Sequence, residues 1–375
     1  MQNKKIGYFK MGSFSHTNEQ VKNLLIKNFP DHEVEVIDVL DDLLNINNPL
    51  LWLSCAKEYL IDALLRKRSF VDSVYRTNYF FKLVKEKSAQ LIEKKQYAFT
   101  FQTQSLFDVS YEGIANYLYT DHTHLANLYY PAFDKKKLYP SKWIELEKSI
   151  YHNATMNFTM SSHVSRSIRE HYQCPESKIK NVCVGSNASN ANVAGNDARY
   201  KSQNILFMGV AWERKGGPQL IEAFQKVLKT LPDATLTIVG CKPKLNQANC
   251  NIVGRVPLEE TPSYYENAAV FCLPTRLEPF GIVFIEALTH KLPIVASNIG
   301  AIPDFIEDGI NGYTVDPDDI DGIARSLINL LKAPDKCKQF GESGHKIVSE
   351  RYSWESTGKR IRNEILKRQM PQNKS

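Results

Sequence analysis

The hydrophobic and polar positions of the chain follow two periods. Short apolar runs rich in β-branched and aromatic residues alternate with longer segments that have the spacing of amphipathic helices. Ten apolar runs predict strands, at Ile6–Phe9, Val34–Val39, Tyr97–Gln102, Tyr117–Thr120, Met156–Met160, Val182–Val184, Ile205–Val210, Thr235–Val239, Val270–Leu273 and Ile294–Ala296. Segments of helical period lie between them, for example Ser165–Tyr172 and Gln219–Leu231. This alternation is typical of parallel sheets with crossover helices, so we expect an α/β fold with two doubly wound sheets.

A polar segment between the two series of strands predicts a domain boundary. Residues 186–202 have only Val193 and Tyr200 as large apolar side chains and cannot bury a core of their own. We expect an N-terminal Rossmann-like domain over residues 1–185, a linker over 186–202, a second Rossmann-like domain over 203–345, and a helical region with a basic tail over 346–375 that crosses back to the first domain. Doubly wound sheets bind ligands at the carboxyl ends of their strands, so the two sheets should face a cleft.

An insertion between the second and third predicted strands, Leu50–Lys95, is open to two interpretations. It holds seven aromatic residues, and from Lys57 to Lys87 it has eight basic against four acidic residues. Aromatic and basic side chains together suit anionic headgroups, which favours an interfacial or acceptor-docking surface. The alternative is a pair of ordinary helices with the aromatic residues in the core and the charges in water.

Composition and charge exclude several classes of protein. With 43% hydrophobic and 23% charged residues the chain is unlike a disordered, collagenous or coiled-coil protein. The formal charge is 47 − 41 = +6, but residues 351–375 hold seven Lys or Arg and two Glu, a local +5. The rest of the chain is nearly neutral, which argues against a broad nucleic-acid-binding face.

The cysteine pattern and the lack of long apolar runs indicate the cellular compartment in which the protein is expected. The seven cysteines are an odd set without C-x-x-C spacing, which indicates reduced thiols in an intracellular protein. Lys10 interrupts the apolar start that a signal peptide needs, and no run approaches the ~18 apolar residues of a membrane span. We expect a cytoplasmic protein, and the basic tail and the insertion leave open a peripheral contact with the cytoplasmic face of an anionic membrane.

The most informative motif runs from Glu278 to Glu286, after the predicted strand Val270–Leu273. A helix that begins near Phe280–Gly281 would present free N–H groups and its dipole to a diphosphate. Glu278 could accept hydrogen bonds from sugar hydroxyls, and Glu286, about two turns along, from ribose hydroxyls. A capping glutamate in a loop and a surface glutamate on a helix would give the same spacing.

Three segments together resemble the retaining glycosyltransferases of family 4, also called glycosyl transferases group 1. They are Glu278–Glu286, Phe207–Gly217 and Asp308–Tyr313. The resemblance implies the GT-B fold, a nucleotide-sugar donor on the second domain, and an acceptor on the first. It also implies hexosyl transfer to an acceptor hydroxyl with retention of configuration, and neither a cofactor nor a metal. The acceptor could be a glycan, a lipid-linked molecule or a small molecule.

Other functions on the same fold stay open. One alternative is a catalytically silent subunit that binds a nucleotide sugar, and another is a GT-B epimerase or phosphorylase. Turnover of a nucleotide sugar without any acceptor would favour an epimerase, and dependence on phosphate would favour a phosphorylase. Tight nucleotide binding without turnover would favour the silent subunit.

The resemblance also assigns roles to residues of the second half. Lys215 would contact the donor diphosphate, and Glu278 the donor sugar. Many relatives carry an arginine where this chain has Val210, and Arg214 is the natural substitute because its planar fork can grip phosphate oxygens. A loop at Val253–Val256 would offer main-chain contacts to the base, although an ordinary tight turn fits it as well. The donor-binding candidates are Gly12, Val210, Gly254, Arg255, Val256, Pro279, Phe280, Gly281, Ile282 and Glu286.

In the first half the candidates follow two predicted strands. Asp121, His122 and His124 come after Tyr117–Thr120, where relatives place a histidine near the reacting sugar; here Asp121 takes that position, so which of the three faces the sugar stays open. A helix cap by Asp121 and a metal site of Asp-His-x-His type are the alternatives.

The loop after the first strand places His16 on the acceptor side, together with Gly12. It lacks G-x-G-x-x-G, so a nicotinamide or flavin site is not supported. Asp316-Pro317-Asp318 predicts turn and capping chemistry, not a metal site.

Overall fold

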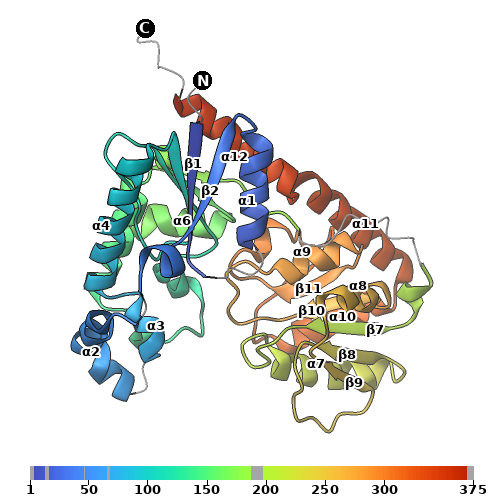
Figure 1. The fold of residues 1–375 in the computed structure, drawn as a ribbon. Coiled ribbons are helices and arrows are strands. Elements are labelled where there is room, and N and C mark those ends of the chain that lie inside the picture. Colours follow the sequence, from blue (N-terminus) through green and yellow to red (C-terminus); the bar gives the residue numbers. More distant parts are fainter. Residues whose placement is uncertain (1–3, 13–16, 46, 66–67, 187–196, 370–375) are drawn as a thin grey trace. The chain divides into compact units, whose positions relative to one another are not determined.

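The computed structural model describes all residues except 1–3, 13–16, 46, 66–67, 187–196 and 370–375 (Figure 1). The chain forms two compact units. Unit 1 consists of Met1–Leu128, Phe133–Cys183 and Trp354–Ser375, and unit 2 of Tyr129–Ala132 and Val184–Ser353. Each unit contains one six-stranded sheet in which all paired strands are parallel. The expected α/β fold class with two doubly wound sheets is confirmed.

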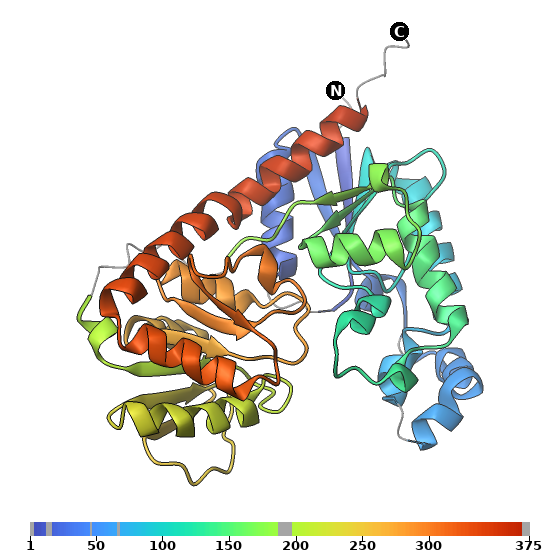
Figure 2. The same cartoon turned by 180° about the vertical axis from the view of Figure 1, so that it is seen from behind.

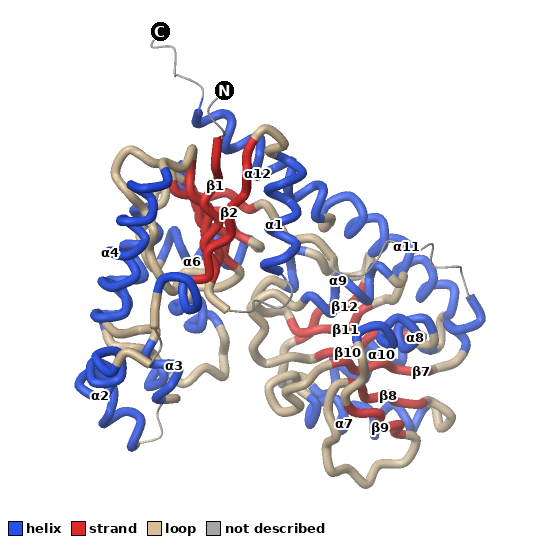
Figure 3. The backbone as a smooth tube through the Cα atoms, in the orientation of Figure 1, coloured by secondary structure: helices blue, strands red, loops and turns tan. Residues whose placement is uncertain are grey.

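The sheet of unit 1 has the strand order β2-β1-β3-β4-β5-β6. Figure 3 draws the strands in red and labels β1 and β2 of this sheet. Its strands are β1 (Lys4–Lys10), β2 (His32–Asp38), β3 (Phe99–Thr103), β4 (Asn116–Thr120), β5 (Met156–Thr159) and β6 (Ile179–Asn181). Its α-helices are α1 (Thr17–Asn28), α2 (Pro49–Leu64), α3 (Phe70–Val74), α4 (Asn78–Lys95), α5 (Ser141–Asn153), α6 (Ser162–Glu170) and α12 (Trp354–Gln369). The chain leaves β1 in one direction toward β2 and later returns to the other side of β1 through β3, so the strand order reverses there.

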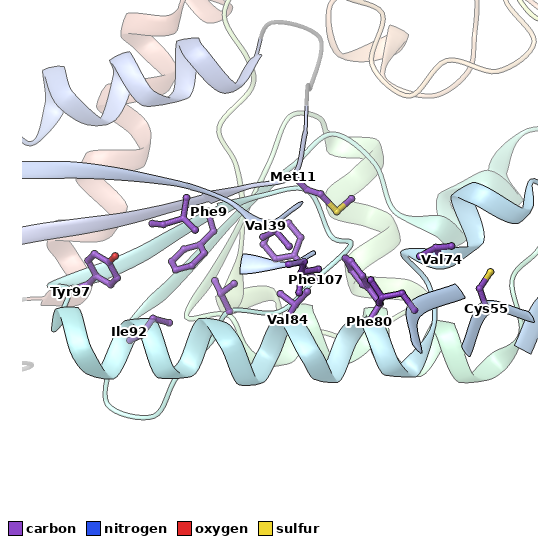
Figure 4. Close-up of a cluster of buried hydrophobic side chains, with 14 of the residues drawn as sticks. Phe9, Met11, Val39, Cys55, Val74, Phe80, Val84, Ile92, Tyr97 and Phe107 are labelled. Atoms are coloured by element: carbon purple, nitrogen blue, oxygen red, sulfur yellow. The ribbon is translucent and has the colours of Figure 1, made fainter. Parts of the chain in front are cut away.

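Apolar side chains fill both faces of this sheet. One core cluster joins α2 and α4 to the strands, with Phe9, Phe80 and Val84 among its fully buried members (Figure 4). A second cluster packs α5 and α6 around Trp143 and Tyr172. On the opposite face α1 packs against α12 (Figures 1 and 2).

The insertion Leu50–Lys95 forms α2, α3 and α4. Its aromatic residues are buried or pack against the core clusters, so they follow the second interpretation of that segment. Several aliphatic residues of α2, in contrast, are exposed.

The sheet of unit 2 has the order β12-β11-β10-β7-β8-β9. Its strands are β7 (Asn204–Met208), β8 (Thr235–Val239), β9 (Cys250–Gly254), β10 (Val270–Leu273), β11 (Ile294–Ser297) and β12 (Gly312–Val315). Its α-helices are α7 (Gly217–Thr230), α8 (Thr261–Glu266), α9 (Ile282–Thr289), α10 (Ile320–Leu331) and α11 (Pro334–Arg351). Helix α7 packs with α10, and α9 with α11.

Two differences from the predicted strands have a local cause. The strand expected at Val182–Val184 is wrong, since β6 ends at Asn181; Cys183 has φ +60°, which an extended strand cannot contain. The strands β9 and β12 were missed because most of their residues are partly or fully exposed and lack the continuous apolar run of a buried strand.

The predicted linker and the C-terminal helical region are the segments expected to join the two domains. Residues 187–196 of the predicted linker lie outside the described residues. Within unit 2, Asp197–Lys201 form a short 3-10 helix, and the buried Arg199 donates to the carbonyl of His290 at 2.7 Å. After α11, the helix α12 lies in unit 1, where Arg362 Nε donates to the carbonyl of Asn28 at 2.9 Å. Over the part of the chain that the structure describes, we find no helix with the length and apolar character needed to cross a membrane.

Candidate functional site

The strand order of unit 2 reverses between β7 and its neighbour β10, which is where doubly wound sheets bind ligands. The two loops that follow these strands are joined by hydrogen bonds. Arg276 N donates to the carbonyl of Arg214 at 2.9 Å, and Arg214 Nη1 donates to the carbonyl of Leu277 at 2.7 Å. The side chain of Thr275 donates to both carbonyls. The loops therefore form one platform at the carboxyl edge of the sheet.

On this platform Lys215 Nζ is paired with the carboxylate of Glu278. Both residues are buried, with 8% of Lys215 and 6% of Glu278 exposed. Removing one member of a buried pair leaves an uncompensated charge, so the two residues depend on each other. The sequence predicted both as ligand contacts but not their mutual ion pair. A phosphate that binds Lys215 would have to compete with Glu278 for it.

The turn from Glu278 to α9 is fixed on several sides. Gly281 has φ +92°, a conformation that favours glycine, and it precedes the first residue of α9, Ile282. Phe280 is buried against Phe305, with ring centroids 5.8 Å apart, and Tyr130 Oη donates to the carbonyl of Glu278 at 2.8 Å. Phe284 N donates to the carbonyl of Gly281 at 3.0 Å, while the amides of Ile282 and Val283 precede the first intrahelical bonds, so this terminus suits an anion. The half-buried Pro279 completes the turn.

Glu286 lies one turn into α9, not two, because the helix begins at Ile282. Tyr265 Oη donates to Glu286 Oε2 at 2.9 Å. The Tyr265 ring stacks on His290, with centroids 5.2 Å apart and an interplanar angle of 11°. Burial raises the pKa of Glu286. Tyr265 was not predicted from the sequence, because nothing in its local pattern links it to Glu286.

The remaining candidates of unit 2 lie at the ends of β7 and β9. Val210 follows β7 and is 61% exposed. Gly254 is the last residue of β9, with φ +89°, and its carbonyl accepts from Gly240 N at 2.7 Å. Beyond the strand Arg255 is exposed and Val256 half-buried. The segment predicted as a loop at Val253–Val256 thus begins inside a strand.

Unit 1 has a cavity of about 210 Å³ where β3 and β4 end. It brings together the three candidates after β4: Asp121, His122 and His124. The other lining residues are Arg76, Gln104, Ser105, Leu106, Thr120, Thr123, Asn127, Trp143 and Glu147. Gly12 does not line it; its N–H donates to Asp38 Oδ1 at 3.4 Å and its φ is +57°. His16 lies outside the described residues.

Burial sets the protonation of these groups. It raises the pKa of Asp121 to about 6 and lowers the pKa of His122 to about 4. The pKa of His124 is lowered to about 3, first by burial and then by the charge of Arg76. Both histidines are therefore neutral at neutral pH. His124 Nε2 accepts from Tyr139 N at 2.8 Å, which holds its ring in place. A 3-10 helix, His124–Tyr129, follows β4. Its cap is the side chain of Thr123, which accepts from Ala126 N at 3.1 Å, so the alternative role of Asp121 as a cap is wrong.

Comparison with known proteins identifies the second half of the chain. Residues 190–347 match the model of the family described as glycosyl transferases group 1. The chain carries a group 1 glycosyltransferase domain.

Other proteins with this domain are similar to the chain over part of their length. A GDP-mannose-dependent alpha-(1-6)-phosphatidylinositol monomannoside mannosyltransferase of Mycolicibacterium smegmatis is 31% identical over 166 residues, which are 40% of this chain and 44% of the relative. The chain spans about half the length of this and other curated relatives that it matches.

Solved structures show the fold. The sucrose-phosphate synthase of Thermosynechococcus elongatus superposes with a TM-score of 0.67 at 16% identity, over 98% of this chain and 99% of that one. HepE of Anabaena, solved in complex with UDP and glucose, superposes with a TM-score of 0.64 at 11% identity, over 97% of this chain and 100% of that one. The fold that accompanies the group 1 glycosyltransferase domain here is GT-B, as the sequence resemblance implied.

Glu147 is a residue of the unit 1 cavity that the sequence analysis missed. It is 2% exposed and accepts from Tyr151 Oη at 2.9 Å, from His124 N at 3.0 Å and from Tyr172 Oη. It lies on the apolar face of α5, four residues after Trp143 and four before Tyr151. A glutamate within an apolar helical stripe is the signal that could have found it. The sequence around Arg76, which also lines the cavity, contains no comparable signal.

The described residues show no metal cluster. Among them no three or more His, Cys, Asp or Glu side chains are grouped so that they could hold an ion. Asp316 Oδ1 accepts from Asp318 N at 3.0 Å, and Asp319 caps α10 by accepting from Gly322 N at 2.8 Å. The turn predicted for Asp316-Pro317-Asp318 is confirmed, whereas the cap of α10 is made by the next residue, Asp319.

The neutral histidines of unit 1 predict a loss of stability in acid. His122 and His124 have pKa values of about 4 and about 3, well below the ordinary 6.5, so between these values the unfolded chain binds protons that the folded chain does not. The free energy of unfolding should therefore fall as the pH drops from about 6.5 toward 4. Asp121 acts in the opposite direction, because its raised pKa makes the folded chain bind a proton first.

We expect His124→Gln to flatten this dependence by up to about 1.4 kcal/mol per pH unit, since one proton fewer is taken up on unfolding. Glutamine keeps an acceptor for Tyr139 N. Urea unfolding of both proteins across this pH range measures the slope. Equal slopes for the variant and the wild type would show that His124 is already protonated in the folded chain.

Proposed function

We propose that this chain is a metal-independent, retaining glycosyltransferase that moves a sugar from a nucleotide-sugar donor to an acceptor hydroxyl. The observation that carries the proposal is the buried pair of Lys215 and Glu278 beside the N-terminus of α9, at the reversal of strand order in unit 2. A cation and helix amides at one point suit a diphosphate. The names of the relatives, which include GDP-mannose and UDP, agree with a donor of this class.

In the proposed complex the diphosphate lies between Lys215, Arg214 and the first amides of α9. Breaking the bond between the sugar and the phosphate leaves one more negative charge on the diphosphate. Lys215 and Arg214 oppose that charge, so they stabilise the transition state more than the bound donor. Arg214 is exposed and its Nη1 donates to the carbonyl of Leu277, so the other N–H groups of the guanidinium can reach a phosphate oxygen. Glu278, released from Lys215, accepts from hydroxyls of the donor sugar, and Glu286 accepts from the ribose.

The transfer itself needs no protein nucleophile. The acceptor oxygen forms the new bond to the anomeric carbon on the face from which the diphosphate departs, and a phosphate oxygen takes the acceptor proton. Configuration is then retained, and atoms and charges balance. In unit 1, Asp121 or a neighbouring histidine would orient the acceptor or bind the donor sugar.

Glu278→Gln tests the proposal. We expect donor turnover to fall about 10- to 100-fold, because an acceptor for the sugar hydroxyls loses its charge. Binding of the nucleoside diphosphate alone should stay equal or become tighter, because Lys215 no longer has to leave an ionised partner. Thermal shift with UDP-, GDP- and ADP-sugars identifies the donor, and the released diphosphate measures turnover.

The outcomes separate the alternatives. Wild-type turnover in Glu278→Gln would contradict the role of this carboxylate. Binding without turnover for every acceptor tried would favour a silent nucleotide-sugar-binding subunit. Turnover without an acceptor would favour an epimerase, and a requirement for phosphate a phosphorylase.

A further inference from the structure

The outer face of α2 is an unusual concentration of exposed apolar side chains. Six of the eleven large hydrophobic residues that are exposed in the described chain lie on α2 or directly after it. They are Leu50 (52% exposed), Leu53 (67%), Leu60 (46%), Ile61 (73%), Leu64 (74%) and Leu65 (60%). Spacings of three and four residues place them on one side of the helix, and Val71 of α3, 54% exposed, follows them. We define the six residues of this side as the α2 face.

The opposite side of α2 is firmly held. Leu51 and Cys55 are fully buried and Tyr59 is 3% exposed, in the core cluster of unit 1 (Figure 4). Tyr59 Oη donates to the carbonyl of Arg76 at 2.9 Å, and Cys55 Sγ donates to that of Phe70 at 3.3 Å. Because the buried side of α2 packs into the core, the α2 face on the other side lies outside the core. The helix is therefore apolar on both sides. A helix that is apolar all round normally has a partner on each side.

The charges of α2 show what kind of partner fits. Lys57 lies at the centre of the α2 face and has no carboxylate within ion-pair distance in the part of the chain that the structure describes. The two acidic residues of the helix are already engaged. Glu58 accepts from Asn78 N at 3.2 Å, and Asp62 is paired with Arg68 at 2.8 Å. The α2 face thus presents leucines around one unpaired cation.

A second copy of the chain fits this pattern poorly. Lys57 is the midpoint between Leu50 and Leu64, so two α2 faces paired antiparallel would bring the two Lys57 ammonium groups together at the symmetry axis. That contact would bury two like charges without a counter-ion. At a bilayer surface the leucines can enter the acyl boundary, while the lysine stem lies along it and the ammonium reaches anionic headgroups.

We propose that the α2 face docks unit 1 on the surface of a lipid bilayer that carries anionic headgroups. This inference does not rest on the proposed glycosyl transfer, because the α2 face shares no residue with the platform of unit 2. The hydrophobic residues supply most of the binding, and Lys57 supplies the preference for anionic lipid.

Co-sedimentation of the full chain with vesicles tests the proposal. One set of vesicles contains equimolar phosphatidylglycerol and phosphatidylcholine, and the other phosphatidylcholine alone. We expect the wild type to bind the anionic vesicles more tightly. The double variant Leu53→Asp/Ile61→Asp should bind them at least about tenfold more weakly, since two large side chains lose their burial in lipid. Lys57→Glu should weaken binding to anionic vesicles about five- to tenfold and leave the neutral vesicles nearly unaffected.

A matched control is Ile26→Asp, a substitution of an apolar residue on α1 that is 48% exposed. It should bind vesicles like the wild type. Because all these positions are exposed, thermal unfolding should be unchanged; if the double variant unfolds, Lys57→Glu alone decides the result. Equal vesicle binding by wild type and Lys57→Glu, or no binding of the wild type to either vesicle, would overturn the proposal. A concentration-dependent dimer in sedimentation velocity that Leu53→Asp/Ile61→Asp abolishes would assign the α2 face to a second copy instead.

Discussion

Replacing Lys215 with alanine is expected to lower kcat/KM for nucleotide-sugar turnover by about a hundred- to a thousand-fold, the usual effect of removing one preorganised group that faces developing negative charge. Lys215 is buried beside Glu278, so its ammonium is held at one point instead of moving freely in solvent. The alanine variant also leaves the buried Glu278 carboxylate without its partner, which repels the diphosphate. Initial rates of diphosphate release measure the loss.

Two further variants make this result specific. Lys215→Met keeps most of the bulk of the side chain and should lose activity to the same extent. Lys226→Ala removes an exposed lysine of the same unit, which pairs with Asp321 at 2.6 Å, and should change the rate less than twofold. If Lys215→Met turned over donor at the rate of Lys226→Ala, the ammonium would have no part in the reaction.

The second large effect concerns stability. Gly216 adjoins Lys215, has φ +75°, and lies against the residue that follows β10: a Cβ atom at Gly216 would lie 1.9 Å from the carbonyl oxygen of Pro274. Gly216→Ala therefore combines an unfavourable backbone conformation, about 1–2 kcal/mol, with a clash against backbone that has to move, about 1–3 kcal/mol. We expect a loss of about 2–5 kcal/mol, and a fall of the unfolding midpoint of unit 2 by about 5–15 °C.

Gly309→Ala is the matched control for this variant. Gly309 has the same φ of +75°, but nothing lies within 4 Å of a Cβ atom placed there. Its substitution should cost only the backbone part, about 1–2 kcal/mol. Calorimetry of both variants separates the two contributions. Equal midpoints would mean that the loops after β7 and β10 are not as closely packed as the contact between Gly216 and Pro274 indicates.

How much of the fold the sequence could predict depended on burial. The strands β8 and β10 have the bounds that were predicted, Thr235–Val239 and Val270–Leu273, because strands inside a parallel sheet are continuous apolar runs. The partly exposed β12 has no such run. The outer face of α2 could not be recognised either, because a helix that is apolar on both sides does not reveal which side the rest of the chain covers.

Some residues of the candidate site could be predicted from the sequence, but the contacts between them could not. Lys215 and Glu278 could be found from a resemblance of short segments, although they stand 63 positions apart. Their pairing with each other, and the support from Tyr130 and Tyr265, could not, because those contacts depend on how separate loops pack. In unit 1 the sequence placed Asp121, His122 and His124 together but did not indicate Arg76, which lines the same cavity from the turn between α3 and α4.

A crystal structure with the nucleoside diphosphate that gives the largest thermal shift would show where the diphosphate binds. We expect its oxygens within hydrogen-bond distance of Lys215 Nζ and of the amides that open α9, with the Glu278 carboxylate turned away from Lys215. A diphosphate bound elsewhere, with the pair of Lys215 and Glu278 intact, would contradict it.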